Sequence, residues 1–404
     1  MRGPFTAIVS VARIPPFCFR PRTIRKVAAL SLRALPTPCL LLDVARLRRN
    51  IARMKGRLPS HVQVRPHLKT SKCVEIAREV MSTPAGPATV STLKEAEVFA
   101  AAGVRDLLYA VGIAPAKLPR VLTLRQSGVN LSIVLDSLAQ AQAVVAACRS
   151  ANDRVPVLIE VDCDGDRAGL PPGDPLVVEI GRVLLRGNAE LRGIMTHAGG
   201  SYDHPGADAH AIAAEQERAA ATRSAEELRR ANLPCAVVSV GATPTARFAR
   251  DLTGVTEVRA GVFVFFDLIM AGLGVCNVDD IALSVLATVI GHQKQKEWIL
   301  VDAGWMALSQ DRGTANQALD QGYGMVCDLR GRPYPDLIVT RTNQEHGVLS
   351  MRADSAARLP ELPVGSLVRI LPVHACATAA QFGFYHVMDE NGTVTDVWQR
   401  FSGW

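Results

Sequence analysis

The chain has 404 residues, of which 48% are hydrophobic and 21% charged, so it is long enough for one large or two medium domains and too apolar to be disordered. Its net charge of +7 is carried entirely by seven basic residues before Asp43, in a stretch that has no acid, and the rest of the chain is neutral. This distribution argues against a basic nucleic-acid-binding face, and no apolar run is long enough to span a membrane.

Residues 1–35 form a basic extension whose role stays open. The segment is rich in Arg and lacks acids, as organelle transit peptides do, but its prolines would break a helix. A lengthened start of the chain is the other interpretation. The nine cysteines are scattered without a CxxC pair, which indicates free thiols in a reducing compartment, and we expect a cytoplasmic location.

Eight strand-like apolar runs lie between residues 60 and 265, and helical patterns separate them. The runs are Val62–Pro66, Ala88–Thr92, Asp106–Val111, Leu131–Asp136, Val157–Asp162, Leu191–His197, Ala236–Gly241 and Glu257–Val262. The clearest helical patterns are Leu93–Ala102, Ser137–Ser150 and Ala207–Ala231. This alternation predicts an α/β fold built as a closed (β/α)8 barrel, with a doubly wound open sheet as the alternative.

After about residue 280 the pattern changes to short β-like runs that are separated by turns. These runs are Ile281–Gly291, Trp298–Val301, Leu337–Thr342, Ser366–Pro372 and Thr393–Gln399. We therefore expect the barrel over residues 36–275 and a C-terminal all-β domain over residues 276–404. The strand-like segment Pro38–Leu42, within residues 36–45, is expected to pair with the β domain.

Polar residues cluster at the ends of the predicted barrel strands, where the active sites of such barrels lie. Lys69 follows the first strand in the segment Arg65–Thr70, and a lysine among buried polar neighbours can form a Schiff base. Arg167 follows the fifth strand, where it would hold a pyridine nitrogen unprotonated or bind a carboxylate. His197 ends the sixth strand and could stack on a ring. A solvated lysine, a surface ion pair of Arg167 and a structural histidine are the alternatives.

Two loops rich in small residues follow the seventh and eighth predicted strands, where barrels commonly bind phosphate through backbone N–H groups. The first loop, Ser239–Thr245, includes Thr243, and the second contains Gly261 and Val262. Tyr202, beyond the sixth strand, could also reach a phosphate.

His374 and Cys376 follow the predicted strand Val368–Pro372. Residues i and i+2 of a strand face the same side, and an imidazole beside a thiolate suits Zn²⁺ or a similar metal. Two protein ligands leave room for water or substrate, as in a catalytic metal site. Chance occurrence of the HxC pattern is the alternative, and the polar cluster Asn343–His346 could support the metal ligands.

Together these segments resemble the fold-type III pyridoxal-phosphate enzymes, in particular the D-serine dehydratase and D-threonine aldolase group. The resemblance covers residues 36–404 in the family's order and is carried by Arg65–Lys72, Asp162–Gly169, Thr196–Tyr202, Gly241–Thr245 and His374–Cys376. Within the group it is strongest toward bacterial dehydratases of D-threo-3-hydroxyaspartate, through Val90–Glu97, Asp302–Ala307, Asp311–Ala315, Asn343–Gly347 and His374–Thr378. It implies an alanine-racemase-like barrel that carries the cofactor and a C-terminal β domain that carries a divalent metal.

The resemblance also implies roles for individual residues. Lys69 would hold pyridoxal phosphate as a Schiff base, and Arg167 would face its pyridine nitrogen. The other cofactor contacts would come from His67, His197, Tyr202, Ser239, Thr243, Gly261 and Val262. His374 and Cys376 would bind the metal, which could be Zn²⁺, Mn²⁺, Co²⁺ or Ni²⁺.

The implied reaction is the dehydration of a D-3-hydroxy amino acid. Lys69 would remove the Cα proton and the metal would act as Lewis acid on the β-hydroxyl, so that D-threo-3-hydroxyaspartate or D-serine gives a 2-oxo acid and ammonia. Retro-aldol cleavage of the D-threonine aldolase type, amino-acid racemisation and a non-catalytic pyridoxal-phosphate carrier are the alternatives. Arg312 is a candidate for binding a β-carboxylate. By analogy we expect a homodimer that acts on a small-molecule D-amino acid, with no nucleic-acid or membrane partner.

Overall fold

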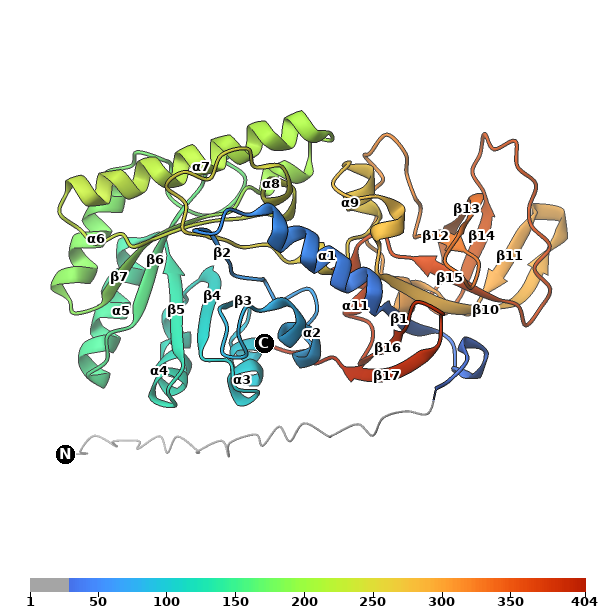
Figure 1. The fold of residues 1–404 in the computed structure, drawn as a ribbon, viewed down its shortest axis with the longest axis horizontal. Helices are drawn as coiled ribbons and strands as arrows, with labels where there is room; N and C mark the ends of the chain where they lie inside the picture. The colour runs from blue at the N-terminus through green and yellow to red at the C-terminus, as the bar shows by residue number, and fades with distance from the viewer. Residues whose placement is uncertain (1–28) are drawn as a thin grey trace, which may run out of the picture.

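The computed structural model describes residues 29–404, so that the predictions for the first 28 residues of the basic extension lie outside the described part. Figure 1 shows two bodies side by side, a barrel of strands surrounded by helices and a C-terminal β domain, with the chain end returning to the barrel. Apolar residues of both bodies belong to one continuous buried cluster, which includes Leu68 of the barrel and Tyr385 of the β domain.

Eight parallel strands form the barrel, as the sequence predicted. In spatial order they are β2 (Gln63–Val64), β9 (Glu257–Val258), β8 (Val237–Val240), β7 (Glu190–Thr196), β6 (Pro156–Val161), β5 (Asn130–Leu135), β4 (Asp106–Gly112) and β3 (Ala88–Val90). The ring closes where the chain beyond β2 forms a parallel bridge between His67 and Thr89, with Leu68 N donating to Thr89 O at 2.9 Å. The sheet is therefore closed, and the doubly wound open alternative is wrong.

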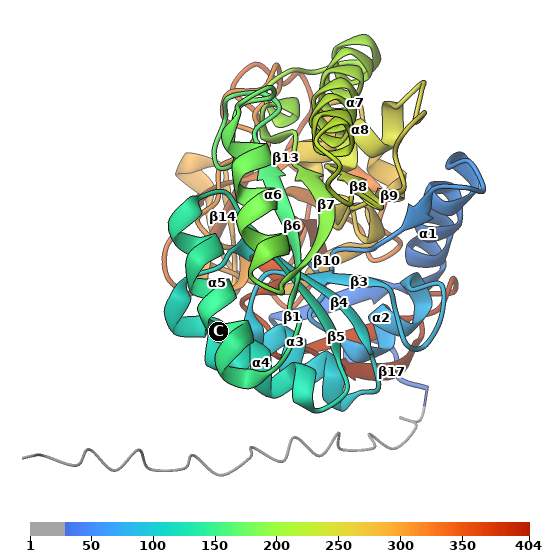
Figure 2. The same cartoon turned by 90° about the vertical axis from the view of Figure 1, so that its left-hand side faces the viewer.

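Helices cover the outside of the barrel, and Figure 2 shows α4 to α8 packed around its strands. The helices of this part of the chain are α1 (Val44–Arg57), α2 (Val74–Val80), α3 (Leu93–Ala101), α4 (Leu118–Gln126), α5 (Leu138–Ala151), α6 (Leu176–Arg186), α7 (Ala207–Arg230), α8 (Thr243–Phe248) and α9 (Leu268–Gly272). Local sequence explains their starts, because Asp43, Thr92 and Ser137 each cap a helix by accepting a backbone N–H of its first turn. The three helices predicted from the sequence correspond to α3, α5 and α7.

The β domain contains a closed antiparallel ring with a three-strand extension. The ring consists of β10 (Leu283–Gln293), β11 (Trp298–Val301), β14 (Gly347–Met351), β13 (Pro333–Thr342), β12 (Met325–Cys327) and β15 (Leu367–Leu371). Beside β10 lie β1 (Cys39–Asp43), β16 (Phe384–Met388) and β17 (Val394–Gln399), so the chain's first strand pairs within this domain. Sequence reasoning missed β12, β14 and β16, which have three to five residues each, and did not predict the short helices α10 (Trp305–Leu308) and α11 (Ala375–Ala379).

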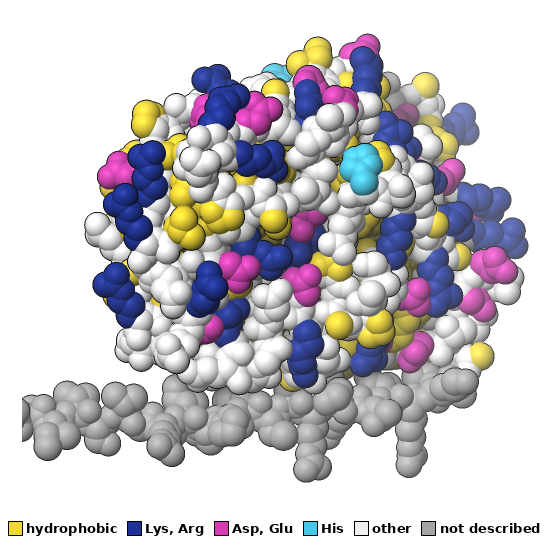
Figure 3. All heavy atoms as spheres, turned by 60° about the vertical axis from the view of Figure 1, so that its left-hand side comes forward, with side chains coloured by type: hydrophobic (Ala, Val, Ile, Leu, Met, Phe, Trp, Pro, Cys, Tyr) yellow, Lys and Arg dark blue, Asp and Glu magenta, His cyan; other side chains and the backbone are white. Residues whose placement is uncertain are grey.

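The described surface agrees with a chain body of balanced charge. On the face in Figure 3, Lys and Arg side chains are interspersed with Asp and Glu. The eight cysteines of residues 29–404 are all free, as expected for this part of the chain. None of the helices in the described range combines the length and apolar character that crossing a bilayer requires.

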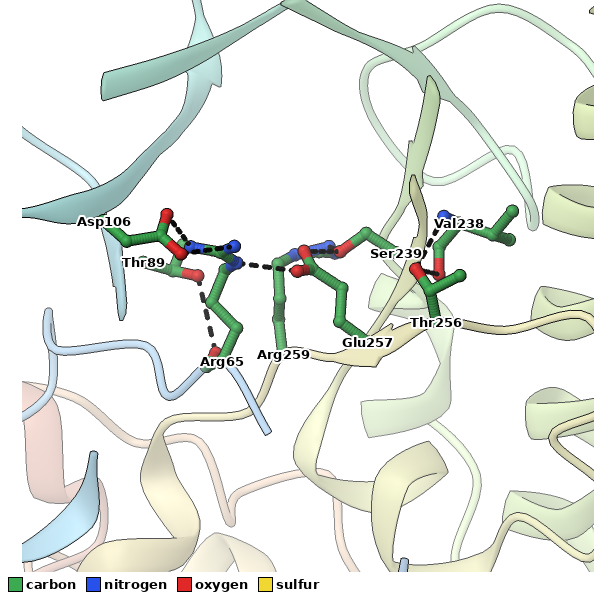
Figure 4. Close-up of polar contacts among 8 residues, drawn as sticks. All are labelled: Arg65, Thr89, Asp106, Val238, Ser239, Thr256, Glu257 and Arg259. Carbon is green, nitrogen blue, oxygen red and sulfur yellow. Dashed lines mark hydrogen bonds and ion pairs between the residues drawn. The ribbon is translucent and has the colours of Figure 1, made fainter. Parts of the chain in front are cut away.

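A layer of charged side chains fills the barrel interior beneath the carboxyl ends of the strands (Figure 4). Arg65 Nε donates to Glu257 Oε2 at 2.8 Å, and its Nη1 donates to Asp106 Oδ1 at 2.9 Å. Ser239 Oγ donates to Glu257 Oε1 at 2.7 Å and accepts from Arg259 Nη1 at 3.3 Å. Glu257 is therefore the shared carboxylate of this layer, and it binds Arg65 directly and Arg259 through Ser239.

Removing the charge of Glu257 should destabilise the barrel strongly. Arg65, Glu257 and Arg259 are all buried, and a buried cation that loses its partner costs about 3–5 kcal/mol of unfolding free energy. We expect Glu257→Gln to show such a loss in urea denaturation. The matched control is Glu226→Gln, which breaks an exposed i,i+4 pair with Arg230 and should change the free energy by about 0.5 kcal/mol or less. Equal losses in the two variants would contradict the importance of this layer.

Candidate functional site

A cavity of about 510 Å³ lies at the carboxyl ends of the barrel strands, where they face the β domain. Its size is in the usual range for sites that bind small molecules. The structure brings ten of the eleven residues predicted from the sequence to its wall, namely His67, Lys69, Arg167, His197, Tyr202, Thr243, Gly261, Val262, His374 and Cys376. Ser239 does not line the cavity, because it is fully buried on β8 and its hydroxyl belongs to the charged layer below.

Lys69 lies in a turn that follows β2 and is exposed, although the sequence suggested a partly buried lysine. The difference arises because the side chain borders the open cavity instead of packing into the barrel. The chain after β9 approaches this turn closely at Gly261, where a Cβ atom would lie 2.9 Å from His67 O and 3.1 Å from Thr70 Oγ1. Glycine is therefore required at position 261 for the two segments to meet.

Two histidines beside Lys69 are held neutral. Burial, and next the positive charges of Lys69 and Arg259, keep the pKa of His67 well below its ordinary value. Burial also lowers the pKa of His197 to about 4. His197 Nδ1 lies 2.6 Å from Gly241 O, and because a carbonyl only accepts, Nδ1 carries the ring proton and Nε2 remains an acceptor. Neither ring adds a positive charge to this wall at neutral pH.

The loops after β7 and β8 are joined by Glu217, a buried carboxylate on α7 that sequence reasoning missed. Its oxygens accept from Gly241 N at 2.8 Å, Ala198 N at 3.2 Å and Thr245 Oγ1 at 2.7 Å. Nothing in the Ala-rich helix sequence distinguishes this glutamate from its exposed neighbours. In the neighbouring wall, Thr243 Oγ1 is buried and has no hydrogen-bond partner among the described residues, so it is available to a ligand.

Arg167 lies in the turn after β6 and lines the cavity without forming an ion pair in the described part of the chain. The surface ion pair that was the alternative for this residue is therefore not formed. Glu160, on β6, also lines the cavity, and burial raises its pKa against the opposing effect of Arg259 and Arg167. The cavity thus contains one exposed guanidinium group from the barrel.

His374 and Cys376 reach the cavity from the β domain, but the predicted local geometry is wrong. The strand β15 ends at Leu371, His374 caps the amino end of α11, and Cys376 lies in the first turn of that helix. The pair still meets, because a hydrogen bond joins the two side chains and lowers the pKa of Cys376 against the opposing effect of burial. The strand argument gave the right neighbours for the wrong reason.

Asp311 orients His374, with Oδ2 lying 2.7 Å from His374 Nδ1. Burial opposes a charge on the ring, but this bond and the neighbouring Cys376 raise the pKa of His374 to about 11. With Nδ1 engaged by Asp311, Nε2 is the ring nitrogen that could bind a metal ion. Sequence reasoning included Asp311 in a family-like stretch but gave it no role.

The part of the chain that is described contains no group of three or more His, Cys, Asp and Glu side chains arranged to hold a metal ion. His374 and Cys376 line the cavity and remain two candidate ligands, with no third such side chain arranged beside them among the described residues. The cluster Asn343–His346 is an exposed turn that does not line the cavity, and its support of these ligands stays a prediction. Arg312 pairs with Asp320 instead of lining the cavity, and its role with a β-carboxylate stays a prediction.

Asp267 attaches the His374 segment to the barrel, and sequence reasoning missed it. Its Oδ1 accepts from Met270 N and its Oδ2 from Ala375 N, both at 2.9 Å, so that one carboxylate caps α9 and α11. Next to it, Leu268 N donates to Pro372 O and Ile269 N to Val373 O, each at 3.1 Å. An Asp before an apolar stretch is a pattern typical of a helix start, so the bond to Met270 could have been predicted. The second partner of Asp267, Ala375, lies 108 residues later in the chain and could not.

The chain matches two family models. Residues 42–268 match "Alanine racemase, N-terminal domain", and residues 282–388 match a serine dehydratase domain. The D-threo-3-hydroxyaspartate dehydratase of Delftia sp. (strain HT23) is 52% identical over 379 residues, which are 93% of this chain and 99% of that protein. Its solved structure covers 93% of this chain and all of its own, with a TM-score of 0.89 and 51% identity.

More distant relatives include other enzymes of D-amino acids. A D-serine dehydratase of Dictyostelium discoideum is 29% identical, covering 92% of this chain and 98% of that protein, and a D-threonine aldolase of Arthrobacter sp. is 28% identical, covering 91% and 93%. Solved structures of D-threo-3-hydroxyaspartate dehydratase also include a histidine-to-alanine mutant and a cysteine-to-alanine mutant in the metal-free form, at positions separated by one residue.

The neutral state of His197 predicts a pH-dependent contribution to stability. Its folded pKa of about 4 is below the ordinary value of 6.5, so the unfolded chain binds the extra proton first as the pH falls. The contribution is present above pH 6.5 and is lost progressively toward pH 4. In urea unfolding of cofactor-free protein across this window, His197→Asn should show a smaller loss of stability than the wild type. The control His346→Asn, whose ring is exposed, should follow the wild type. Identical slopes of unfolding free energy against pH in all three proteins would contradict the prediction.

Proposed function

This chain belongs to the family of alanine-racemase-like enzymes that carry a serine dehydratase domain, and from that premise we propose that it removes water from a D-3-hydroxy amino acid. The preferred substrate is D-threo-3-hydroxyaspartate, which gives oxaloacetate and ammonia; D-serine would give pyruvate. The observation that carries the proposal is that Lys69 of the barrel and the pair His374 and Cys376 of the β domain line one cavity. A substrate bound in this cavity could therefore reach both the cofactor on Lys69 and a metal on His374 and Cys376.

The residues of the cavity fit pyridoxal phosphate. Lys69 offers an accessible primary amine that would hold the cofactor, and Thr243 offers a buried hydroxyl that has no partner within residues 29–404. Tyr202, Gly261 and Val262 line the same wall and would complete the contacts with the phosphate. When bound, pyridoxal phosphate withdraws electrons from the Cα of an amino acid and so stabilises a carbanion there.

The other assigned residues would orient the ring and set its charge. Arg167, which forms no ion pair with the described residues, would face the pyridine nitrogen, and His67 and His197 would contact the ring as neutral imidazoles. Ser239 would act on the site through Glu257 and Arg259 instead of touching the cofactor. We assign the removal of the Cα proton to Lys69 Nζ, because it is an amine on the cavity wall that can serve as general base.

We propose that His374 and Cys376 hold a divalent metal. Asp311 engages His374 Nδ1, which directs Nε2 toward the metal, as outer partners of metal-binding histidines commonly do. A cation held there supplies Lewis acidity to a hydroxyl group. The relative whose cysteine mutant is metal-free supports this assignment, since its mutated histidine and cysteine have the spacing of His374 and Cys376. Imidazole and thiolate are compatible with Zn²⁺, Mn²⁺, Co²⁺ or Ni²⁺.

The proposed reaction is dehydration and not retro-aldol cleavage, and the proposed assembly is a homodimer. The identity to the dehydratase of Delftia sp. is 52%, against 28% to the D-threonine aldolase of Arthrobacter sp.. Racemisation and a carrier role would leave the His374 and Cys376 pair without a use. The dimer rests on analogy with barrel enzymes of this type and is tested by light scattering.

The product of the reaction tests the proposal directly. We expect purified protein with pyridoxal phosphate and Mn²⁺ or Zn²⁺ to release ammonia and a 2-oxo acid from D-threo-3-hydroxyaspartate faster than from D-serine. EDTA should abolish the release, and metal should restore it. Glycine and an aldehyde from D-threonine would instead identify an aldolase.

Separate variants test the amine and the metal pair. Lys69→Ala should lower kcat at least about 10³-fold, because it removes both the cofactor attachment and the proposed base. His374→Ala should lose bound metal, measured by elemental analysis, while retaining bound pyridoxal phosphate. Lys294→Ala, at an exposed position outside the cavity, is the control and should match the wild type in all three measurements. Full activity of Lys69→Ala would overturn its assignment.

A further inference from the structure

The backbone that follows Lys69 is held by the C-terminal end of the chain. Tyr385 Oη on β16 donates to Ser71 O at 2.6 Å. The N–H of Phe401 donates to Lys72 O at 3.0 Å, and Cys73 forms an antiparallel bridge with Arg400. Three consecutive residues after the Lys69 turn are thus bound by residues more than 300 positions later in the chain.

The turn that carries Lys69 has an uncommon backbone conformation that needs such support. Lys72 has a φ of 42°, in the left-handed region that disfavours residues with a side chain, and its N–H donates to Leu68 O at 2.9 Å. Lys72 Nζ lies 3.2 Å from Glu95, whose carboxylate is fully buried at the start of α3. Backbone of this kind persists when the surrounding contacts determine it.

The C-terminal segment is itself fixed to the barrel. The Phe401 ring packs edge-on against Phe99 of α3, with centroids 5.3 Å apart. Arg120 of α4 donates to Trp404 O at 3.4 Å, so the last residues lie on the barrel helices. Figure 1 likewise shows the C-terminus near α2 and α3. The segment therefore extends from the β domain to the barrel and contacts Lys72 and Cys73 directly after the Lys69 turn.

Tyr385 is well suited to be a constant donor to this turn. Its side chain is fully buried, and burial raises the pKa of its phenol far above the ordinary value, so the hydroxyl keeps its proton at all working pH values. A carbonyl such as Ser71 O needs a partner when it is buried. Phenylalanine would fill nearly the same space and lose only the hydrogen bonds of the hydroxyl, to Ser71 O and with the Arg400 side chain of the C-terminal segment. The contact can therefore be tested without creating a cavity.

We propose that Tyr385 and Phe401 are positioning residues that fix the Lys69 turn, so that Lys69 presents its amine to the cofactor and the substrate at a set place in the cavity. This inference rests on the proposed role of Lys69. It assigns a function to the C-terminal segment that is separate from metal binding, since neither residue lines the cavity. A small displacement of a catalytic amine can cost as much as about 100-fold in rate.

The test compares Tyr385→Phe with the matched control Tyr334→Phe, which removes a phenol hydroxyl from β13 of the β domain, far along the chain from these contacts. The first readout is hydrogen exchange of peptides that cover residues 69–76 in cofactor-free full-length protein. The second is the rate at which added pyridoxal phosphate becomes linked to Lys69, followed by absorbance and by mass analysis after borohydride reduction. The third is kcat and KM of the loaded enzyme.

For Tyr385→Phe we expect exchange in this peptide to be about tenfold faster, cofactor attachment to be slower, and kcat to fall about 10- to 100-fold with a smaller change in KM. Phe401→Leu, which loses the contact with Phe99 but keeps its backbone N–H, should show a weaker effect of the same kind. Tyr334→Phe should match the wild type.

Exchange and attachment rates for Tyr385→Phe that equal those of Tyr334→Phe would overturn the proposal, whatever the activity. Because these two readouts need no substrate, they remain informative if the dehydratase proposal fails. If the wild type has no dehydratase activity but Tyr385→Phe still changes the exchange and attachment rates, the positioning role is supported and the proposed reaction is rejected. Wild-type protein that never links the cofactor to Lys69 would overturn the positioning role as well.

Discussion

One carboxylate, that of Asp267, determines whether the groups from the two domains can meet. The residue is almost fully buried, and each of its oxygens accepts a backbone N–H, one from α9 beside the barrel and one from α11 in the β domain. A buried carboxylate is costly unless such donors are present, so the two helix starts and the carboxylate stabilise one another. Because His374 caps α11 and Cys376 is in its first turn, the bond to Ala375 N sets both side chains above the barrel mouth.

Beneath this mouth, the barrel interior determines the electrostatic character of the site. Arg65 and Arg259 are both buried, and the carboxylate of Glu257 compensates their positive charges. It binds Arg65 directly and contacts Arg259 through Ser239. Burial first, and then the positive charges of Arg259 and Lys69, lower the pKa of His67 and of His197 and keep both rings neutral. The wall next to Lys69 therefore offers neutral ring surfaces and acceptors, and Arg167, like Lys69, presents an exposed cationic group to the cavity.

The sequence predicted the parts of this molecule that depend on local pattern. Eight apolar runs identified the barrel strands, and residues such as Lys69 and Thr243 were found because strand ends meet at one face of a barrel. The contacts that were missed join distant segments. Glu217 is one polar residue on a long helix, and Asp267 has its decisive partner in the other domain. Ser239 was misplaced because alternation along β8 turns it into the barrel interior, which no local pattern around it reveals.

These long-range contacts explain why the site cannot be divided between its two domains. The turn that carries Lys69 is approached by Gly261 from β9, its Thr70 hydroxyl lies 3.4 Å from Cys376 Sγ, and its outer backbone is bound by Tyr385 and the C-terminal segment. Each contact comes from a different part of the chain, and two of the three belong to the β domain. A barrel without that domain would retain the lysine but lose the groups that fix its turn. The β domain therefore contributes to the geometry of the amine as well as candidate ligands for a metal.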